Sequence, residues 1–287
     1  MMRGLPEMKS KKNIALITGI SLMALLFIIQ IVKPDQSTGA SDVKHEGTPT
    51  IFVHGYRGSL NSFKGMMERF QTEREWGEKT LICTSEQRVA ECESLTKEKV
   101  ENPLIQVFFE ENDSNFEKTS IELGNILKLL KSEYGYDKVN IVAHSMGGLV
   151  SVNYIQETRQ EKEFPKVEKL VTIGSPFQGI NKEVFQKRYG ENDHDLIARS
   201  MAIKELYAEK GNFDPHTKVY SIAGKISEQE DGDGLVSVKS ATSMREVVTS
   251  DKYREQVIVS KKATHNGLHE NKEVDEEVGN FIWGTSN

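Results

Sequence analysis

Residues 139–150 read Val-Asn-Ile-Val-Ala-His-Ser-Met-Gly-Gly-Leu-Val, and this stretch decides how the surrounding chain can fold. The apolar run Val139–Ala143 predicts a buried strand, and residues 146–160 predict a helix that follows it directly. Ser145 therefore stands at a sharp turn from strand to helix. Such a turn strains the backbone, and the small residues that flank the serine (one Ala and two Gly) give it the space to form.

This turn would direct the positive end of the following helix at the Ser145 hydroxyl. It would also direct the Met146 N–H at an oxyanion that develops beside that hydroxyl. We therefore predict that Ser145 is a nucleophile and that Met146 supplies one backbone donor of an oxyanion hole. The alternative is an ordinary serine that caps a helix.

The same alternation of strand and helix continues along the chain. The predicted strands are Thr50–Val53, Leu104–Phe109, Val139–Ala143, Leu170–Ile173, Val219–Ala223 and Gln256–Val259, and the predicted helices are Ser62–Phe70, Phe116–Tyr134, 146–160 and Val274–Trp283. Strands that alternate with helices of this length imply right-handed crossovers and a mostly parallel sheet. Residues 48–287 thus predict one doubly wound α/β domain. A charged, partly helical stretch at about 180–215 predicts a short cap insertion.

A second loop with a chemical signature follows the first predicted strand. Residues 51–58 read Ile-Phe-Val-His-Gly-Tyr-Arg-Gly, so a strand again ends in a glycine-containing loop. This loop is where a second oxyanion donor is expected, and we assign it to the Tyr56 N–H. We expect His54 to hold the loop by hydrogen bonds.

These motifs resemble the α/β-hydrolases, in which a nucleophile, an acid and a histidine follow in that order. The Ala-x-Ser-x-Gly turn is similar to that of small bacterial lipases. The whole chain more closely resembles an uncharacterised group of membrane-anchored, cell-surface α/β-hydrolases of Gram-positive bacteria. The segments Asn102–Phe109 and Gly174-Ser-Pro-Phe-Gln-Gly are typical of that group. The resemblance implies the fold and a catalytic triad, but no substrate.

The acid of such a triad should follow the strand Val219–Ala223. We prefer Asp233, because Asp-Gly-Leu-Val resembles the lipase pattern in which this residue orients the histidine. Asp231 is the alternative. The acidic, glycine-rich loop around them could instead bind calcium, although the later glutamate ligand of a calcium loop is missing at the required spacing.

The histidine of the triad should lie in the loop between the last strand and the closing helix. His265 does so, and the His-x-Gly-Leu sequence that it begins resembles the corresponding stretch of the lipases. His269 lies about one helical turn later, and we expect it to be packed or solvated. The predicted triad is Ser145, Asp233 and His265.

The N-terminus departs most from an average globular composition. Residues 1–13 form a basic flank, residues 14–32 an apolar run and residues 33–47 a polar tether. Nineteen residues of helix rise about 28 Å, enough to cross a bilayer core of about 30 Å. The flank should remain in the cytoplasm, which predicts a single-pass anchor with the domain outside the cell. If the run is instead a cleaved signal peptide, the protein is secreted.

Charge and cysteine content fit an exported protein that binds no nucleic acid. The net charge is −6, and beyond residue 33 there are 32 basic and 42 acidic residues. This balance lacks the excess of cations that phosphate neutralisation requires. Cys83 and Cys92 lie on two runs that could pair as a hairpin. A disulfide between them is permitted outside the cell, and two free thiols are the alternative.

The predicted reaction is hydrolysis of a carboxylic ester through an acyl-enzyme, which needs no metal and no organic cofactor. Because the insertion is charged, we expect a short or partly polar acyl group. Thioesterase, acyltransferase and peptidase chemistry use the same machinery and remain alternatives. A rival of another class is a catalytically silent protein that binds cell-envelope polymers.

Overall fold

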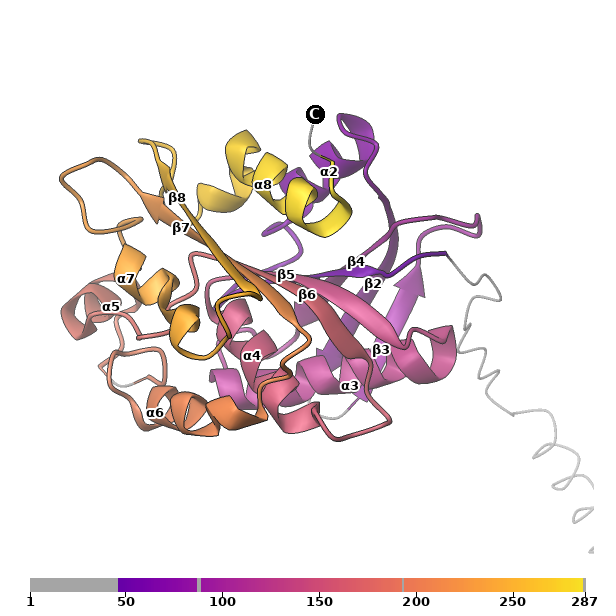
Figure 1. The fold of residues 1–287 in the computed structure, drawn as a ribbon, viewed down its shortest axis with the longest axis horizontal. Coiled ribbons are helices and arrows are strands. Elements are labelled where there is room, and N and C mark those ends of the chain that lie inside the picture. Colours follow the sequence, from indigo (N-terminus) through magenta and orange to yellow (C-terminus); the bar gives the residue numbers. More distant parts are fainter. Residues whose placement is uncertain (1–45, 87–88, 193, 286–287) are drawn as a thin grey trace, which may run out of the picture. The chain divides into compact units, whose positions relative to one another are not determined.

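A computed structural model describes residues 46–86, 89–192 and 194–285 of the chain (Figure 1). The predicted flank 1–13, the predicted anchor 14–32 and most of the tether 33–47 lie outside the described residues. Within the described ranges, no helix combines the length and the apolar character that a membrane span requires.

The described residues contain a sheet of eight strands in the order β3-β2-β4-β1-β5-β6-β7-β8. The strands are β1 Thr50–Val53, β2 Glu78–Glu86, β3 Val89–Ser94, β4 Pro103–Phe109, β5 Lys138–His144, β6 Lys166–Ile173, β7 Lys218–Lys225 and β8 Tyr253–Val259. Only the β2–β3 pair is antiparallel, and the other six pairs are parallel. The predicted doubly wound, mostly parallel sheet is therefore present.

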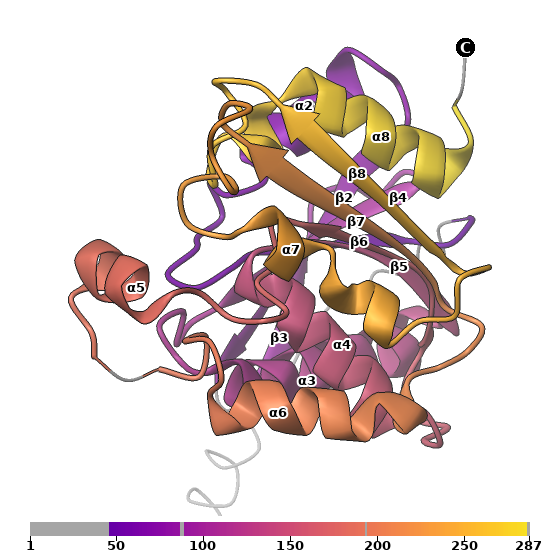
Figure 2. The ribbon, with the colours of Figure 1, turned by 60° about the vertical axis from the view of Figure 1, so that its left-hand side comes forward.

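Helices cover both faces of this sheet. They are α2 Lys64–Thr72, α3 Phe116–Tyr134, α4 Met146–Thr158, α5 Lys182–Tyr189, α6 Met201–Ala208, α7 Val238–Ala241 and α8 Lys272–Trp283. Figure 1 and Figure 2 show α2 and α8 on one face and α3, α4 and α6 on the other. This arrangement explains why the central strands are apolar at nearly every position, as parallel strands buried on both faces are.

The two faces carry separate hydrophobic cores because successive side chains of a strand point to opposite sides. Ile51 and Val53 of β1 face the core under α3 and α4, whereas Phe52 between them packs with Phe63 and Phe70 under α2 and α8. Ring centroids of Phe52 and Phe63 lie 5.4 Å apart. β1 is therefore buried on both faces.

Most of the predicted elements are present, with differences at their ends. The prediction of a helix at Phe116–Tyr134 is confirmed, and Gly135 ends it in a left-handed conformation with φ 72°. The predicted helix 62–70 instead begins at Lys64 and ends at Thr72, because residues 60–63 first form a turn. Several strands extend beyond their apolar centres, since charged residues such as Lys218 pair at the exposed ends of the sheet.

The predicted hairpin forms one edge of the sheet. Cys83 and Cys92 are directly opposed residues of the antiparallel pair, and they form a disulfide. Of the two alternatives left open by the sequence, the disulfide is therefore the one present. The cross-link joins β2 to β3. β3 is the edge strand, because no further strand among the described residues pairs with it.

Candidate active site

The site begins at the turn between β5 and α4, where Ser145 adopts φ 54° and ψ −126°. A positive φ is uncommon for a residue with a Cβ and marks a strained backbone. The surrounding structure holds the turn, because the Ser145 N–H donates to the Ile173 carbonyl at 2.9 Å. The residue is only 4% exposed. The strained strand-to-helix turn predicted at this position is present.

The structure brings together the three residues predicted from distant parts of the chain. The Ser145 Oγ and His265 Nε2 lie 2.9 Å apart, and the His265 Nδ1 and an Asp233 oxygen lie 2.8 Å apart. With a proton on Nδ1, the imidazole donates to the carboxylate and accepts from the serine hydroxyl. This is the geometry of a nucleophile, a base and an orienting acid.

Asp233 is fixed on both sides. Its Oδ1 accepts hydrogen bonds from the Leu235 and Val236 N–H groups at 2.9 and 2.7 Å, which leaves Oδ2 for the imidazole. The backbone N–H of His265 also donates to the backbone carbonyl of Asp233 at 2.9 Å, so the two loops are joined through their backbones. Asp233 is 2% exposed, whereas the alternative acid, Asp231, is exposed and does not contact the imidazole.

Glycines leave the space that this arrangement occupies. A Cβ on Gly174, which has φ 58°, would lie 3.0 Å from the Asp233 Oδ2 and 3.4 Å from the His265 Nδ1. A Cβ on Gly224 would lie 2.6 Å from the Ala263 carbonyl oxygen. The ends of β6 and β7 must therefore lack side chains for the acid and the histidine to meet.

The predicted oxyanion loop lies against the nucleophile turn. A Cβ on Gly55 would come within 2.7 Å of the Ser145 Cβ and 3.3 Å of the Met146 nitrogen. Tyr56 follows that glycine, so its N–H belongs to a backbone in close contact with the serine. Met146 is the first residue of α4, and the N–H groups of a first helical turn have no partner within the helix. Both predicted donors thus flank Ser145.

Two buried histidines support this geometry from behind. His54 joins its Nδ1 to the Gly55 carbonyl at 2.9 Å, and its Nε2 accepts from the Phe109 N–H at 3.2 Å, as the structural role predicted for it requires. His144 donates from Nε2 to the His265 carbonyl at 2.9 Å. Burial lowers the pKa of His144 well below its usual value, so this ring is neutral and keeps a single N–H. His144 thereby holds the loop that carries His265.

A cavity of about 360 Å³ opens over these residues, and Ser145, His265 and Tyr56 all line it. Its walls also include Arg57 from the oxyanion loop and Arg188 from the last turn of α5. Figure 1 places α5 beside the end of the sheet toward which the parallel strands point. The cap insertion therefore contributes a wall of this cavity.

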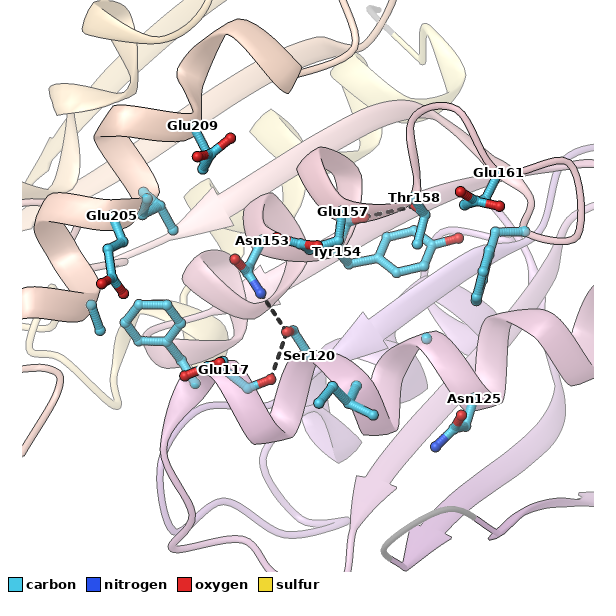
Figure 3. A pocket seen from close by; sticks show the side chains of 16 residues that line it. Glu117, Ser120, Asn125, Asn153, Tyr154, Glu157, Thr158, Glu161, Glu205 and Glu209 are labelled. Carbon is cyan, nitrogen blue, oxygen red and sulfur yellow. Dashed lines mark hydrogen bonds between the residues drawn. The ribbon is translucent and has the colours of Figure 1, made fainter.

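A larger cavity of about 660 Å³ lies away from the triad, between α3, α4 and α6 (Figure 3). Five glutamates from these three helices and from the segments that follow α4 and α6 line it: Glu117, Glu157, Glu161, Glu205 and Glu209. Its Ser120 and Asn153 hydrogen-bond to each other at 2.6 Å. None of the nucleophile, acid or histidine residues reaches this cavity, so we assign the chemistry to the smaller one.

The described residues contain no group of three or more His, Cys, Asp or Glu side chains that could hold a metal ion. In the acidic, glycine-rich loop for which calcium is the alternative, the Asp233 carboxylate accepts hydrogen bonds from two backbone N–H groups and contacts the imidazole. The arrangement fits an acid that orients a histidine.

Sequence patterns missed the residues of the cap that reach the site. Tyr56 donates its hydroxyl to Glu191 at 2.7 Å, and Arg57 donates to the same carboxylate oxygen at 2.7 Å. Burial, together with Glu191, raises the pKa of Tyr56 to about 12, so its hydroxyl remains a donor. Only the clustering of aromatic and basic residues at 185–189 could have indicated that α5 faces the oxyanion loop.

The close contact between the nucleophile turn and the first strand yields a stability prediction. A Cβ on Gly147 would lie 2.5 Å from the Val53 carbonyl oxygen and 2.7 Å from that of His54. Since both are backbone atoms, Gly147→Ala should lower the free energy of unfolding by about 1–3 kcal/mol. Chemical denaturation measures this effect. Gly211→Ala is the control, because a Cβ there meets nothing within 4 Å; equal stability of both variants would contradict the packing.

Comparison with solved structures finds the same fold in several bacterial proteins. The lin2722 gene product of Listeria innocua matches with a TM-score of 0.74 and 25% identity, over 84% of this chain and 96% of that one. A candidate cell surface hydrolase of Lactobacillus plantarum matches with a TM-score of 0.63 and 20% identity, over 85% and 92%. The mature lipase BlEst2 of Bacillus licheniformis matches with a TM-score of 0.54 and 16% identity, over 84% and 96%.

No curated protein matches the chain. A protein family does, and it covers residues 37–285, which include the whole sheet and every residue of the site. That family is described as "Alpha/beta hydrolase of unknown function (DUF915)". The resemblance predicted from the motifs is confirmed, and the chain belongs to this family of α/β-hydrolases.

Proposed function

We propose that this α/β-hydrolase is a serine hydrolase that cleaves carboxylic esters through an acyl-enzyme on Ser145. The observation that carries the proposal is the continuous hydrogen-bonded series from Ser145 through His265 to Asp233, with separations of 2.9 and 2.8 Å. His265 takes the hydroxyl proton as Ser145 attacks the ester carbonyl, and then gives it to the leaving alcohol. Water, activated by the same imidazole, releases the acid and restores the serine.

The negative charge that develops on the carbonyl oxygen needs donors that are already in place. The N–H groups of Tyr56 and Met146 flank the serine, and we assign them to this task. Each such donor stabilises a transition state by about 3–4 kcal/mol in related chemistry. Asp233 keeps the imidazole in the tautomer that can accept the serine proton, and it stabilises the imidazolium that forms.

We also propose that the domain is held outside the cell by the apolar segment 14–32. The basic flank before that segment supports this orientation. The Cys83–Cys92 disulfide supports it independently, because disulfides persist in oxidising compartments and are rare in the cytosol.

The lining of the cavity favours a short or partly polar acyl group. Apart from two tyrosines, the described side chains around Ser145 are glycine, serine, asparagine, histidine and arginine, and none is aliphatic. A long acyl chain would therefore find no apolar channel in which to bury its methylene groups, each of which contributes about 0.8 kcal/mol when buried.

Replacing the nucleophile tests the proposal. Ser145→Ala should reduce hydrolysis of 4-nitrophenyl acetate by about 10⁴-fold or more and abolish labelling by a fluorophosphonate probe. Its melting temperature should stay close to that of the wild type, since the change removes one oxygen. Ser132→Ala, at an exposed position of α3, is the control and should behave as the wild type. Full labelling of Ser145→Ala would remove this residue from the role.

The expected acyl preference has its own measurement. Across 4-nitrophenyl acetate, butyrate, octanoate and palmitate, kcat/KM should be highest for the two shortest esters and fall steeply after them. The reason is the absence of aliphatic lining among the described residues of the cavity. A clear preference for palmitate presented in micelles would overturn the proposed substrate length.

A further inference from the structure

The Ser145 cavity is lined by two arginines, and no aspartate or glutamate of the described residues lines it. Arg57 comes from the loop after β1 and Arg188 from α5, so the two arginines line one cavity from different elements. The chain as a whole has a net charge of −6. Positive charge at this position is therefore a local feature of the site.

Arg57 is held in an unfavourable backbone conformation beside the predicted oxyanion donor. Its φ is 53°, and it is one of four non-glycine residues with positive φ among the described residues, of which Ser145 is another. Its N–H donates to the Asn112 carbonyl at 2.6 Å. Strained residues persist where the surroundings enforce them, and they concentrate at functional sites. Both strained residues of this cavity are thus fixed by backbone hydrogen bonds.

Its contacts orient the side chain of Arg57 but do not occupy all of its hydrogen-bond donors. Its guanidinium carbon lies 5.2 Å from the ring centroid of Tyr56 and 5.8 Å from that of Tyr189. One of its nitrogens donates to Glu191, whose same oxygen also accepts from Tyr56. A guanidinium has five N–H donors in a fixed plane, so donors remain for a second anion. The side chain is 46% exposed, which leaves it accessible.

Arg188 is positioned by the packing of α5. Phe185 of the same helix is fully buried, and its ring lies 6.2 Å from Tyr56 and 5.1 Å from His194. Arg188 itself is exposed and forms no ion pair with a carboxylate of the described residues. The buried phenylalanine therefore fixes the helix, while the arginine faces the cavity that it lines.

The cavity between α3, α4 and α6 has a lining of the opposite charge. Figure 3 shows glutamate side chains around the cavity between α3, α4 and α6, and no lysine or arginine of the described residues lines it. An anionic molecule would be repelled there and attracted at Ser145. Charge thus distinguishes the two cavities, although the acidic one is larger.

We propose that the natural substrate is a carboxylic ester that also carries an anionic phosphate or carboxylate group, bound by Arg57 and Arg188 while Ser145 attacks the ester carbonyl. This inference rests on the proposed esterase function and adds the substrate class. The reaction consumes one water: the acyl C–O bond breaks, the acid and the alcohol are released, and the anionic group is unchanged. Arginine is suited to this task because its planar donors match carboxylate and phosphate oxygens.

Two matched pairs of short esters test the proposal and separate the two sources of the anion. The first compares the 4-nitrophenyl monoester of glutaric acid with 4-nitrophenyl pentanoate. The second compares 1-butyrylglycerol 3-phosphate with 1-butyrylglycerol, and here hydrolysis is measured as the release of acid. In at least one pair the anionic ester should have a kcat/KM about tenfold or more above its neutral partner. This ratio should fall as salt is raised, because exposed charges are screened.

Variants of the two arginines test whether these residues cause the higher kcat/KM for the anionic esters. Arg188→Met and Arg57→Met should each lower the ratio of anionic to neutral kcat/KM severalfold, and Arg188→Lys should retain part of it. A ratio measured within one variant is insensitive to the amount of folded enzyme. Arg254→Met is the matched control, because Arg254 is an exposed residue of β8 that does not line the cavity. It should keep the wild-type ratio.

The outcomes separate this inference from the proposed function. Preference in the phosphate pair alone would assign the site to esters that carry a phosphate, such as lipids with a phosphate head group. Preference in the carboxylate pair alone would assign it to esters with an acidic acyl group. Ratios near one in both wild-type pairs, or ratios unchanged by Arg57→Met and Arg188→Met, would overturn the inference while leaving an esterase. Failure of the wild type to hydrolyse any of the four esters, with no fluorophosphonate labelling, would instead overturn the proposed function.

Discussion

The site depends on one steric constraint, the left-handed backbone of Ser145 between β5 and α4. That conformation places the hydroxyl at the carboxyl edge of the sheet and begins α4 at the next residue. It is possible only because Gly55 and Gly147 let the first-strand loop and the helix approach within contact of the turn. A side chain at either glycine would separate the loop that carries Tyr56 from Ser145.

Burial strengthens the hydrogen bonds among the polar side chains behind Ser145. Asp233, His265 and His144 are all less than a tenth exposed, so water competes little for their hydrogen bonds. Each has defined partners: two N–H groups and an imidazole for Asp233, the Asp233 carboxylate and the Ser145 hydroxyl for His265, and the His265 carbonyl for His144. A buried polar series of this kind allows one arrangement of the imidazole, the arrangement that can accept a proton from Ser145.

Much of the fold and of the site geometry could be predicted from the sequence, because both follow from local patterns. The apolar run before Ser145, the helix Phe116–Tyr134 and its glycine cap are periodic signals that need no tertiary information. The choice of Asp233 and His265 rested on the resemblance of their segments to lipase patterns, and their convergence was expected because parallel strands bring their carboxyl ends to one edge. The roles of these residues in a reaction stay predictions.

Other features depend on contacts that no local pattern carries. The pairing of Arg57 with Glu191 requires that the cap fold back on the first loop, across 134 residues of sequence. The disulfide required the register of β2 and β3, which the sequence left open. Strand ends were short in the predictions because charged residues such as Lys138 join the sheet only when a neighbouring strand supplies a partner.

The proposed mechanism is tested most directly by a crystal structure of the protein treated with a short alkyl phosphonate 4-nitrophenyl ester, whose tetrahedral adduct mimics the transition state of acyl transfer. The mechanism predicts phosphorus bonded to the Ser145 Oγ, with the phosphonyl oxygen within about 3.1 Å of both the Tyr56 and the Met146 nitrogen. An adduct on another residue, or a phosphonyl oxygen that faces away from both N–H groups, would contradict it.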